Sequence, residues 1–247
     1  MRALVIIPTY NERDNLQVIA QELLAIRDVH LMIVDDRSPD GTGDVADALA
    51  AAESPRISVV HRSGLRGLGR SYIEGMQHAL LHTDAPVICQ MDADLSHLPS
   101  DLPRLLDAVR RADLVVGSRY IRGGKVVNWP RRRVWLSSFA NYYVRGLTRL
   151  PVRDVTSGFR CWRRETLLRI PLAGLRSDGY AFQVEMTWQA RAAGARIAEV
   201  PITFVERRQG QSKLSGRVIA ESIVLPLRLA AGAALSRLPG NRARCTL

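Results

Sequence analysis

Short apolar runs alternate with segments of helical spacing through the first half of the chain. The runs cover residues 3–8, 30–36, 57–62, 86–92 and 113–119. Between them, apolar residues recur at helical spacing within 16–24, 73–80 and 102–109. This alternation predicts an α/β protein with a mostly parallel central sheet and flanking helices. Such sheets bind ligands beyond the carboxyl ends of their strands.

Polar residues gather where four of these predicted strands end. The first strand leads into PTYNE at 8–12, and the second ends at Asp35 and Asp36. The fourth ends in the DAD triplet at 92–94, and the fifth ends at 117–119 with Gly-Ser-Arg. Because the carboxyl ends of parallel strands share one edge of a sheet, we expect these clusters to meet at one rim.

The second half of the chain has a less regular pattern. A basic run, Arg131 to Arg133, opens a segment that we interpret as a helix. A loop entering a strand, a loop entering a helix and an edge strand are predicted at 154–165, 177–194 and 196–208. Pro201 indicates an edge or a bulge in the last of these. Without an internal repeat or a low-complexity linker, the sequence predicts one domain with a tail.

Asp92 and Asp94 are the strongest local indication of a site. In an extended chain, residues two apart point to the same side, so both carboxylates face one point while Ala93 faces away. Two such oxygen ligands beside bound phosphates suit Mg²⁺ or Mn²⁺, which completes its shell with water and phosphate oxygens. The other interpretation, a turn that caps the next helix, stays open at this point.

A second acidic group consists of Asp35, Asp36 and Asp40. Asp40 and Gly41 mark a tight turn, and we interpret Asp40 as a turn or cap residue. The adjacent carboxylates of Asp35 and Asp36 repel each other. A donor on a ligand, such as a base or a ribose hydroxyl, would relieve that repulsion.

A glycine-rich segment at 62–72 resembles a dinucleotide-binding loop only superficially. It lacks the G-x-G-x-x-G spacing and follows the third strand, which argues against a dehydrogenase. Its arginines, Arg62, Arg66 and Arg70, are interpreted as solvated surface, although a place near a phosphate stays open.

The chain carries 35 Lys and Arg against 24 Asp and Glu, a net charge of +11. This charge suits nucleic acid, a phospholipid surface or a phosphorylated substrate. Guanidinium groups grip phosphate oxygens bidentately, so the arginines of the chain suit a phosphorylated substrate. Aromatic residues make up only 6% of the chain, and the strand ends are acidic, so we expect no nucleic-acid partner. The unpaired spacing of Cys89, Cys161 and Cys245 indicates neither a disulfide framework nor a zinc cluster and suits a reducing cytoplasm.

We expect no membrane-spanning helix and no signal peptide. A spanning helix needs roughly 18 to 20 uninterrupted apolar residues. The most apolar stretch, 219–238, contains Glu221, Arg228 and Arg237. The N-terminus lacks the apolar core and cleavage site of a signal peptide. An apolar stripe between residues 218 and 231 predicts either a helix on a membrane surface or a helix packed on the core, and both stay open.

Eight segments, in order, resemble one enzyme family. They are PTYNE (8–12), VDDRSPDGT (34–42), GLG (67–69), DADLSH (92–97), GSRY (117–120), TSGFRCWRRE (156–165), SDGYAFQVE (177–185) and VPITFVERRQGQSK (200–213). They resemble the polyprenol-phosphate mannose synthases, which are inverting family 2 glycosyltransferases with a GT-A fold, the nucleotide-diphospho-sugar transferase fold. The resemblance runs from residue 4 to about residue 213, and its last two segments are the most specific. It implies a catalytic domain over 1–215. We expect residues 216–247 to form an amphipathic tail, for which association with a membrane is one of the two open interpretations.

The resemblance implies transfer of mannose from GDP-mannose to a polyprenyl phosphate, with Mg²⁺ or Mn²⁺ as cofactor. A phosphate monoester has a second pKa of roughly 6, so this acceptor needs no strong general base. Our hypothesis for its location is a cytoplasmic protein peripherally bound at the inner leaflet, with a separate membrane-anchoring protein as an optional partner. The alternative function is transfer of glucose or N-acetylhexosamine from a UDP-sugar to the same lipid. An inactive scaffold is disfavoured because the charged site residues are present.

The resemblance also assigns roles to individual residues. The nucleotide-sugar pocket would be lined by Pro8, Tyr10, Glu12, Val34, Asp36, Asp92, Ala93, Arg119 and Arg207. The metal would be bound at Asp92, Asp94 and Ser96. Family members often carry Gln where this chain has Ser96, so a water would bridge from the shorter side chain. The acceptor phosphate would be held by Arg133, Ser137 and Lys213. The catalytic residues would be Asp94, Arg119 and Arg133.

Overall fold

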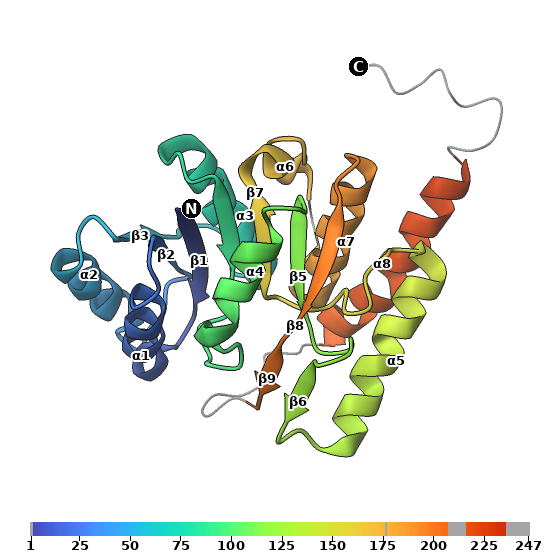
Figure 1. Cartoon of the computed structure of the whole chain (residues 1–247), viewed down its shortest axis with the longest axis horizontal. Helices are drawn as coiled ribbons and strands as arrows, with labels where there is room; N and C mark the ends of the chain where they lie inside the picture. The colour runs from blue at the N-terminus through green and yellow to red at the C-terminus, as the bar shows by residue number, and fades with distance from the viewer. Residues whose placement is uncertain (1, 176, 207–215, 236–247) are drawn as a thin grey trace.

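The computed structural model describes residues 2–175, 177–206 and 216–235 (Figure 1). Its main sheet has seven strands in the order β3-β2-β1-β4-β7-β5-β8. Their bounds are β3 Ile57–His61, β2 Val29–Asp35, β1 Ala3–Thr9, β4 Val87–Gln90, β7 Arg160–Arg163, β5 Leu114–Ser118 and β8 Ile197–Pro201. All pairs are parallel except those of β7, which runs antiparallel to β4 and β5. The predicted mostly parallel sheet is therefore confirmed.

The central strands are buried on both faces, as their apolar runs predict. In β1, Ala3, Val5 and Ile7 belong to one core cluster, whereas Leu4 and Ile6 belong to the cluster on the other side of the sheet. This division follows from the strand geometry, because successive side chains point to opposite faces. The sheet is therefore covered by helices on both sides (Figure 1).

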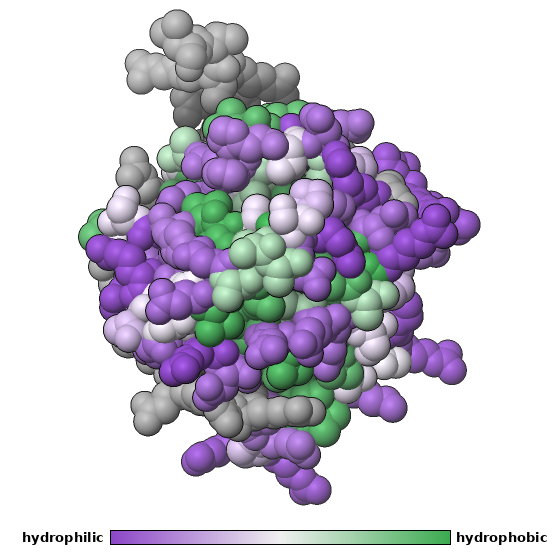
Figure 2. Space-filling view, turned by 90° about the vertical axis from the view of Figure 1, so that its left-hand side faces the viewer, coloured by the Kyte–Doolittle hydropathy of each residue, from purple (hydrophilic) through white to green (hydrophobic). Residues whose placement is uncertain are grey.

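The helices form two layers on the sheet. One layer contains α1 (Arg13–Leu24), α2 (Thr42–Ala52) and α4 (Leu102–Ala108), and the other contains α3 (Leu68–His82) and α7 (Gly179–Ala192). Short helices lie at α6 Arg164–Leu168, η1 Pro99–Asp101 and η2 Leu172–Gly174. The side of the molecule that carries α2 is covered mainly by hydrophilic residues, with smaller hydrophobic areas between them (Figure 2).

A small second sheet lies beyond the end of β8. It pairs β6 (Lys125–Val127) in parallel with β9 (Thr203–Val205). β8 is the edge strand of the main sheet and ends at Pro201, and the chain then passes through Ile202 into β9. The edge position predicted from Pro201 is confirmed: Pro201 is the last residue of an edge strand, and the N–H of the next residue, Ile202, still donates to the carbonyl oxygen of Ser118 at 3.1 Å.

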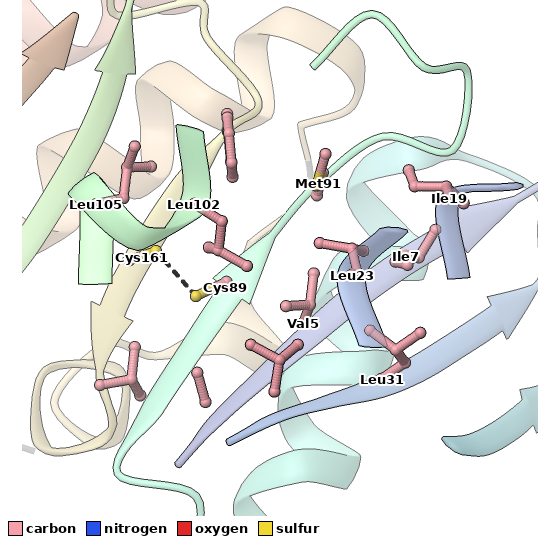
Figure 3. Close-up of a cluster of buried hydrophobic side chains, with 14 of the residues drawn as sticks. Val5, Ile7, Ile19, Leu23, Leu31, Cys89, Met91, Leu102, Leu105 and Cys161 are labelled. Atoms are coloured by element: carbon pink, nitrogen blue, oxygen red, sulfur yellow. Dashed lines mark hydrogen bonds between the residues drawn. The ribbon is translucent and has the colours of Figure 1, made fainter. Parts of the chain in front are cut away.

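Cys89 and Cys161 face each other in the core between β4 and β7 (Figure 3). Their sulfur atoms are 2.8 Å apart, and both cysteines are free and buried. Burial raises the pKa of the Cys161 thiol well above its ordinary value. These two residues therefore act as small apolar core residues, and Cys245 lies outside the described residues.

The helices α5 (Arg131–Thr148) and α8 (Gly216–Leu235) lie side by side at one end of the molecule (Figure 1). The Tyr143 hydroxyl on α5 donates to the carbonyl oxygen of Ile223 at 3.0 Å. Leu225 and Leu229 pack against the core, whereas Ile223, Val224 and Leu227 are exposed. The tail helix thus packs on the domain and still presents an apolar surface. Within the described ranges, no helix is long and apolar enough to cross a bilayer.

Candidate active site

A cavity of about 490 Å³ opens where the parallel strands end. Its lining includes these residues of the strand-end clusters: Pro8, Thr9, Tyr10, Glu12, Asp36, Asp92, Ala93, Asp94 and Arg119. The prediction that the four clusters meet at one rim is confirmed. Residues from the second half complete the wall: Trp129, Arg133, Thr156, Ser157, Gly158, Asp178, Gly179, Tyr180, Gln183 and Phe204.

Donors within the protein hold the two carboxylates of the DAD triplet. The Tyr72 hydroxyl donates to Asp92 Oδ1 at 2.9 Å, and burial raises the pKa of Tyr72, so that it remains a donor. Asp94 Oδ1 accepts from the backbone N–H of Ser96 at 3.1 Å and from its hydroxyl at 2.6 Å. The next helix begins only at Pro99 and has no side-chain cap. The capping interpretation of the triplet is therefore wrong.

Two predicted site residues, Ser96 and Val34, do not line the cavity. Ser96 is fully buried and does not line the cavity, since its hydroxyl is directed to Asp94. Ser96 therefore positions Asp94. Val34 also lies outside the lining, because its side chain packs in the core against Ile6 and Gly75.

The carboxylates at the end of β2 are compensated within the protein. Buried Arg62 donates from Nη1 to Asp36 Oδ1 at 2.6 Å, and the N–H of Gly67 donates to Asp36 Oδ2 at 2.9 Å. Asp35 accepts from Thr9 Oγ1 at 3.0 Å and from Ser38 Oγ at 2.6 Å. The interpretation of Arg62 as solvated is wrong, and Asp36 needs no ligand to relieve its repulsion. The sequence could not indicate this, since the ends of β2 and β3 become neighbours only in the sheet.

The glycine-rich segment packs closely against the loop before α7. The N–H of Gly69 donates to Asp178 Oδ1 at 2.6 Å, and a Cβ on Gly67 would collide with the same carboxylate. Gly67 also has a φ of +155°, in the region that side chains disfavour. Exposed Arg66 lines the cavity, and its Nη1 donates to the Tyr10 hydroxyl at 2.6 Å. The glycines therefore serve a close backbone approach.

Arg119 is buried at the cavity wall and paired with Asp154. Its backbone N–H, Nε and Nη2 donate to the Asp154 carboxylate at 2.9, 2.7 and 2.7 Å. Burial lowers the pKa of Arg119, but the Asp154 carboxylate outweighs it, so the net shift is upward. Nη2 also donates to Thr156 Oγ1 at 2.9 Å. Asp154 was not predicted from the sequence, although the Asp-Val-Thr-Ser loop preceding a strand was a usable signal.

His97 is a second residue without a predicted role. It is buried between the rings of Phe159 and Phe204, and its Nδ1 accepts from the N–H of Asp92 at 3.4 Å. Burial lowers the pKa of His97, outweighing the opposite effect of Asp92 and Asp94. His97 is therefore neutral near pH 7 and braces the DAD loop.

Arg133 lies in the first turn of α5, where Pro130 precedes the helix. Its guanidinium carbon is 3.9 Å from the centre of the Trp129 ring, and Nη1 donates to Glu206 Oε1 at 3.0 Å. Ser137 lies four residues further along the same helix but is not among the lining residues. Arg207 and Lys213 lie outside the described residues.

The fold and the cavity define a glycosyltransferase of the GT-A class. Residues 4–170 match the family model described as "Glycosyl transferase family 2". The chain belongs to glycosyl transferase family 2.

Two curated relatives are similar over most of the chain. The polyprenol monophosphomannose synthase of Mycolicibacterium smegmatis is 50% identical over 224 residues, which cover 90% of this chain and 84% of that protein. The undecaprenyl-phosphate mannosyltransferase of Micrococcus luteus is 48% identical over 248 residues and matches over 100% of both chains. The resemblance to polyprenol-phosphate mannose synthases is confirmed.

Solved structures support the fold. The glucosyl-3-phosphoglycerate synthase of Mycobacterium tuberculosis, crystallised with Mn²⁺, UDP-glucose and phosphoglyceric acid, matches with a TM-score of 0.69 at 19% identity, over 93% of this chain and 80% of that chain. The mannosyl-3-phosphoglycerate synthase of Rubrobacter xylanophilus matches with a TM-score of 0.65 at 19% identity, over 97% of this chain and 77% of that chain. The predicted GT-A fold is confirmed.

Proposed function

We propose that this enzyme transfers mannose from GDP-mannose to a polyprenyl monophosphate. The observation that carries the proposal is one cavity lined by both a carboxylate pair, Asp92 and Asp94, and the guanidinium groups of Arg119 and Arg133. Such a site can bring two anionic substrates together, because cationic groups offset their mutual repulsion. The names of the two relatives support mannose as the sugar and a polyprenyl phosphate as the acceptor.

A divalent cation fits the donor set at the DAD loop. Asp92 and Asp94 would hold Mg²⁺ or Mn²⁺, and Ser96 would fix the orientation of Asp94. Among the described residues there is no group of three His, Cys, Asp or Glu side chains arranged for a metal, so diphosphate oxygens and water would complete the shell. When bound, the cation would supply charge stabilisation for the departing diphosphate.

The protein's own residues would then orient the two substrates. Arg133 would bind the acceptor phosphate, and Arg119, oriented by its ion pair with Asp154, would offer the donors of its remaining nitrogen, Nη1, at the cavity wall. An acceptor phosphate oxygen would form the bond to the anomeric carbon as the bond to GDP breaks on the opposite side, which inverts the configuration. The acceptor is already ionised near neutral pH, so no side chain has to remove a proton.

An aromatic surface on α5 supports contact with a membrane. Trp135, Leu136, Phe139 and Tyr142 are 78%, 70%, 59% and 74% exposed and recur at helical spacing. They follow the basic run that begins at Arg131, and α8 lies beside them (Figure 1). Aromatic residues next to basic ones suit the headgroup region of a bilayer. We propose that this surface binds the cytoplasmic face of the membrane. The alternative is that a separate membrane-anchoring protein binds it.

A transfer assay tests the proposed reaction. Purified enzyme is incubated with a short-chain polyprenyl phosphate, Mg²⁺ and radiolabelled GDP-mannose, UDP-glucose or UDP-N-acetylglucosamine, with and without EDTA. The proposal predicts labelled lipid from GDP-mannose alone, and none after chelation. Asp94→Ala should abolish turnover and leave the circular dichroism spectrum unchanged. The control Asp107→Ala, on the exposed surface of α4, should leave turnover unchanged. Transfer from a UDP-sugar but not from GDP-mannose would refute the proposed donor.

Vesicle flotation tests the membrane surface. With anionic vesicles and the purified chain alone, the double variant Trp135→Ser and Phe139→Ser should bind several-fold more weakly than wild type. Leu81→Ser is the matched control, because Leu81 is 78% exposed on α3. Equal binding of wild type, the double variant and the control would show that the α5 surface does not bind the membrane. Binding only in the presence of a membrane protein would favour a membrane-anchoring protein as the partner of this surface.

A further inference from the structure

Gln183 carries a buried amide group without a hydrogen-bond partner. It lies on α7, it is 1% exposed, and it lines the cavity together with Asp92 and Arg119. Neither its Nε2 nor its Oε1 has a partner within the described part of the chain. Buried side-chain amides are almost always hydrogen-bonded, so an orphaned one beside a ligand cavity requires an explanation.

The backbone of Gln183 is already engaged. Its carbonyl oxygen accepts from Arg160 Nη1 at 2.9 Å and from Thr187 Oγ1 at 2.8 Å. Buried Arg160 also donates to the carbonyl oxygens of Val155 and Ser157, so it ties α7 to the loop that precedes β7. Because the main chain is occupied within the helix, the side chain is the part of Gln183 available to the cavity. These bonds fix the part of the α7 backbone that carries the amide.

The chemistry of the amide limits what it can bind. An amide offers a neutral donor and a neutral acceptor, whereas phosphates prefer guanidinium groups and divalent cations prefer carboxylates. Neighbouring hydroxyl groups of a sugar also present donors and acceptors. The amide therefore matches the uncharged parts of a nucleotide-sugar, which are the hexose, the ribose and the base, better than its diphosphate. Comparison of GDP with GDP-mannose separates the hexose from the other two.

We propose that Gln183 binds hydroxyl groups of the donor hexose and contributes to selection among hexoses. This inference rests on the proposed function, because it requires a nucleotide-sugar in the same cavity. The Gln183 amide would hydrogen-bond the sugar ring while Asp92 and Arg119 face the charged groups. The transferred sugar would be recognised from α7, and the diphosphate from the ends of the strands.

Calorimetric titration of Gln183→Met tests the inference. Methionine has a similar volume and no hydrogen-bonding amide. The Kd of GDP should stay within twofold of wild type, and the Kd of GDP-mannose should rise about tenfold, which equals about 1.4 kcal/mol. The melting temperature should stay equal or rise, because an apolar group replaces an unsatisfied one. An unchanged Kd for GDP-mannose, or an equal loss for GDP, would overturn the inference.

Gln90→Met is the matched control. Gln90 is also fully buried and its Nε2 is unpaired, but it does not line the cavity, and its Oε1 accepts from Trp162 Nε1 at 2.7 Å. This variant should lower the melting temperature and leave both Kd values within twofold. Loss of GDP-mannose affinity in Gln90→Met equal to that in Gln183→Met would indicate a general packing effect and overturn the inference.

GDP-mannose analogues that lack one hydroxyl group identify the contact. For at least one analogue, wild type should lose affinity while Gln183→Met loses no more, because the shared hydrogen bond is already absent. Additive losses for every analogue would refute direct contact. If wild type uses UDP-glucose and not GDP-mannose, the proposed donor fails, and the same comparison with UDP-glucose and UDP decides the role of Gln183.

Discussion

Replacing Asp154 with asparagine should destabilise the protein strongly. Asp154 is 0% exposed and accepts three hydrogen bonds from Arg119, which is itself 6% exposed. Asparagine has nearly the same shape but no charge, so the variant leaves a buried guanidinium without its counter-ion. Breaking a buried ion pair by removing one partner costs about 3–5 kcal/mol. The two side-chain bonds to a charged acceptor, at about 1.5–3 kcal/mol each, give a similar sum.

Urea unfolding followed by circular dichroism measures this loss at pH 7.5 as a change in the free energy of unfolding. Asp47→Asn is the control, because the pair of Asp47 with His61 is exposed, with side-chain exposures of 59% and 51%. An exposed pair contributes about 0–1 kcal/mol. We therefore expect Asp47→Asn to lose less than about 1 kcal/mol. If Asp154→Asn also lost less than about 1 kcal/mol of unfolding free energy, the idea that the buried pair stabilises the site would be refuted.

Three further outcomes are expected. Arg133→Ala should raise the KM for polyprenyl phosphate about tenfold or more and leave the KM for GDP-mannose within twofold, as steady-state kinetics would measure, since a charged hydrogen bond is lost at the acceptor side; equal effects on both would contradict the assignment. Asp40→Ala should lower the free energy of unfolding by about 1 kcal/mol at pH 7, because Asp40 accepts from the N–H of Thr42 at the start of α2. Burial raises the pKa of Asp40, but the hydrogen bonds that its carboxylate accepts outweigh burial and lower the pKa from 3.8. The stabilisation from Asp40 is therefore present above that pH and is lost as the pH falls through the folded-state pKa. Unfolding measurements at pH 7 and pH 3 would show this loss. In a Cys245→Ser background, Cys89 and Cys161 should react with a thiol reagent only after denaturation; rapid reaction of the native protein would show that they are accessible.

Local patterns in the sequence predicted the framework of the fold. The alternating runs gave the parallel strands, because burial on both faces requires continuous apolar residues at those positions. The strand-end clusters indicated the rim where the cavity lies, since every parallel strand delivers its carboxyl end to the same edge. Pro201 indicated the edge strand for a reason contained in the residue itself, because a proline without an N–H is tolerated at the edge of a sheet.

Partners distant in the sequence could be assigned only from the tertiary structure. Arg62 looked like a surface charge, yet it is buried against Asp36, 26 residues away, and Arg119 is held by Asp154, 35 residues away.

The sequence by itself indicated the parallel strands of the first half, helices between them and the edge at which ligands bind, because these depend on residue spacing along one element. It did not indicate β6 or the division of 196–208 into β8 and β9. The tertiary structure alone decided which charges are compensated and that the amide of Gln183 is orphaned beside the cavity. The physical reason is that the cost of burying a charge or an amide depends on which groups surround it, and packing brings those groups from other elements.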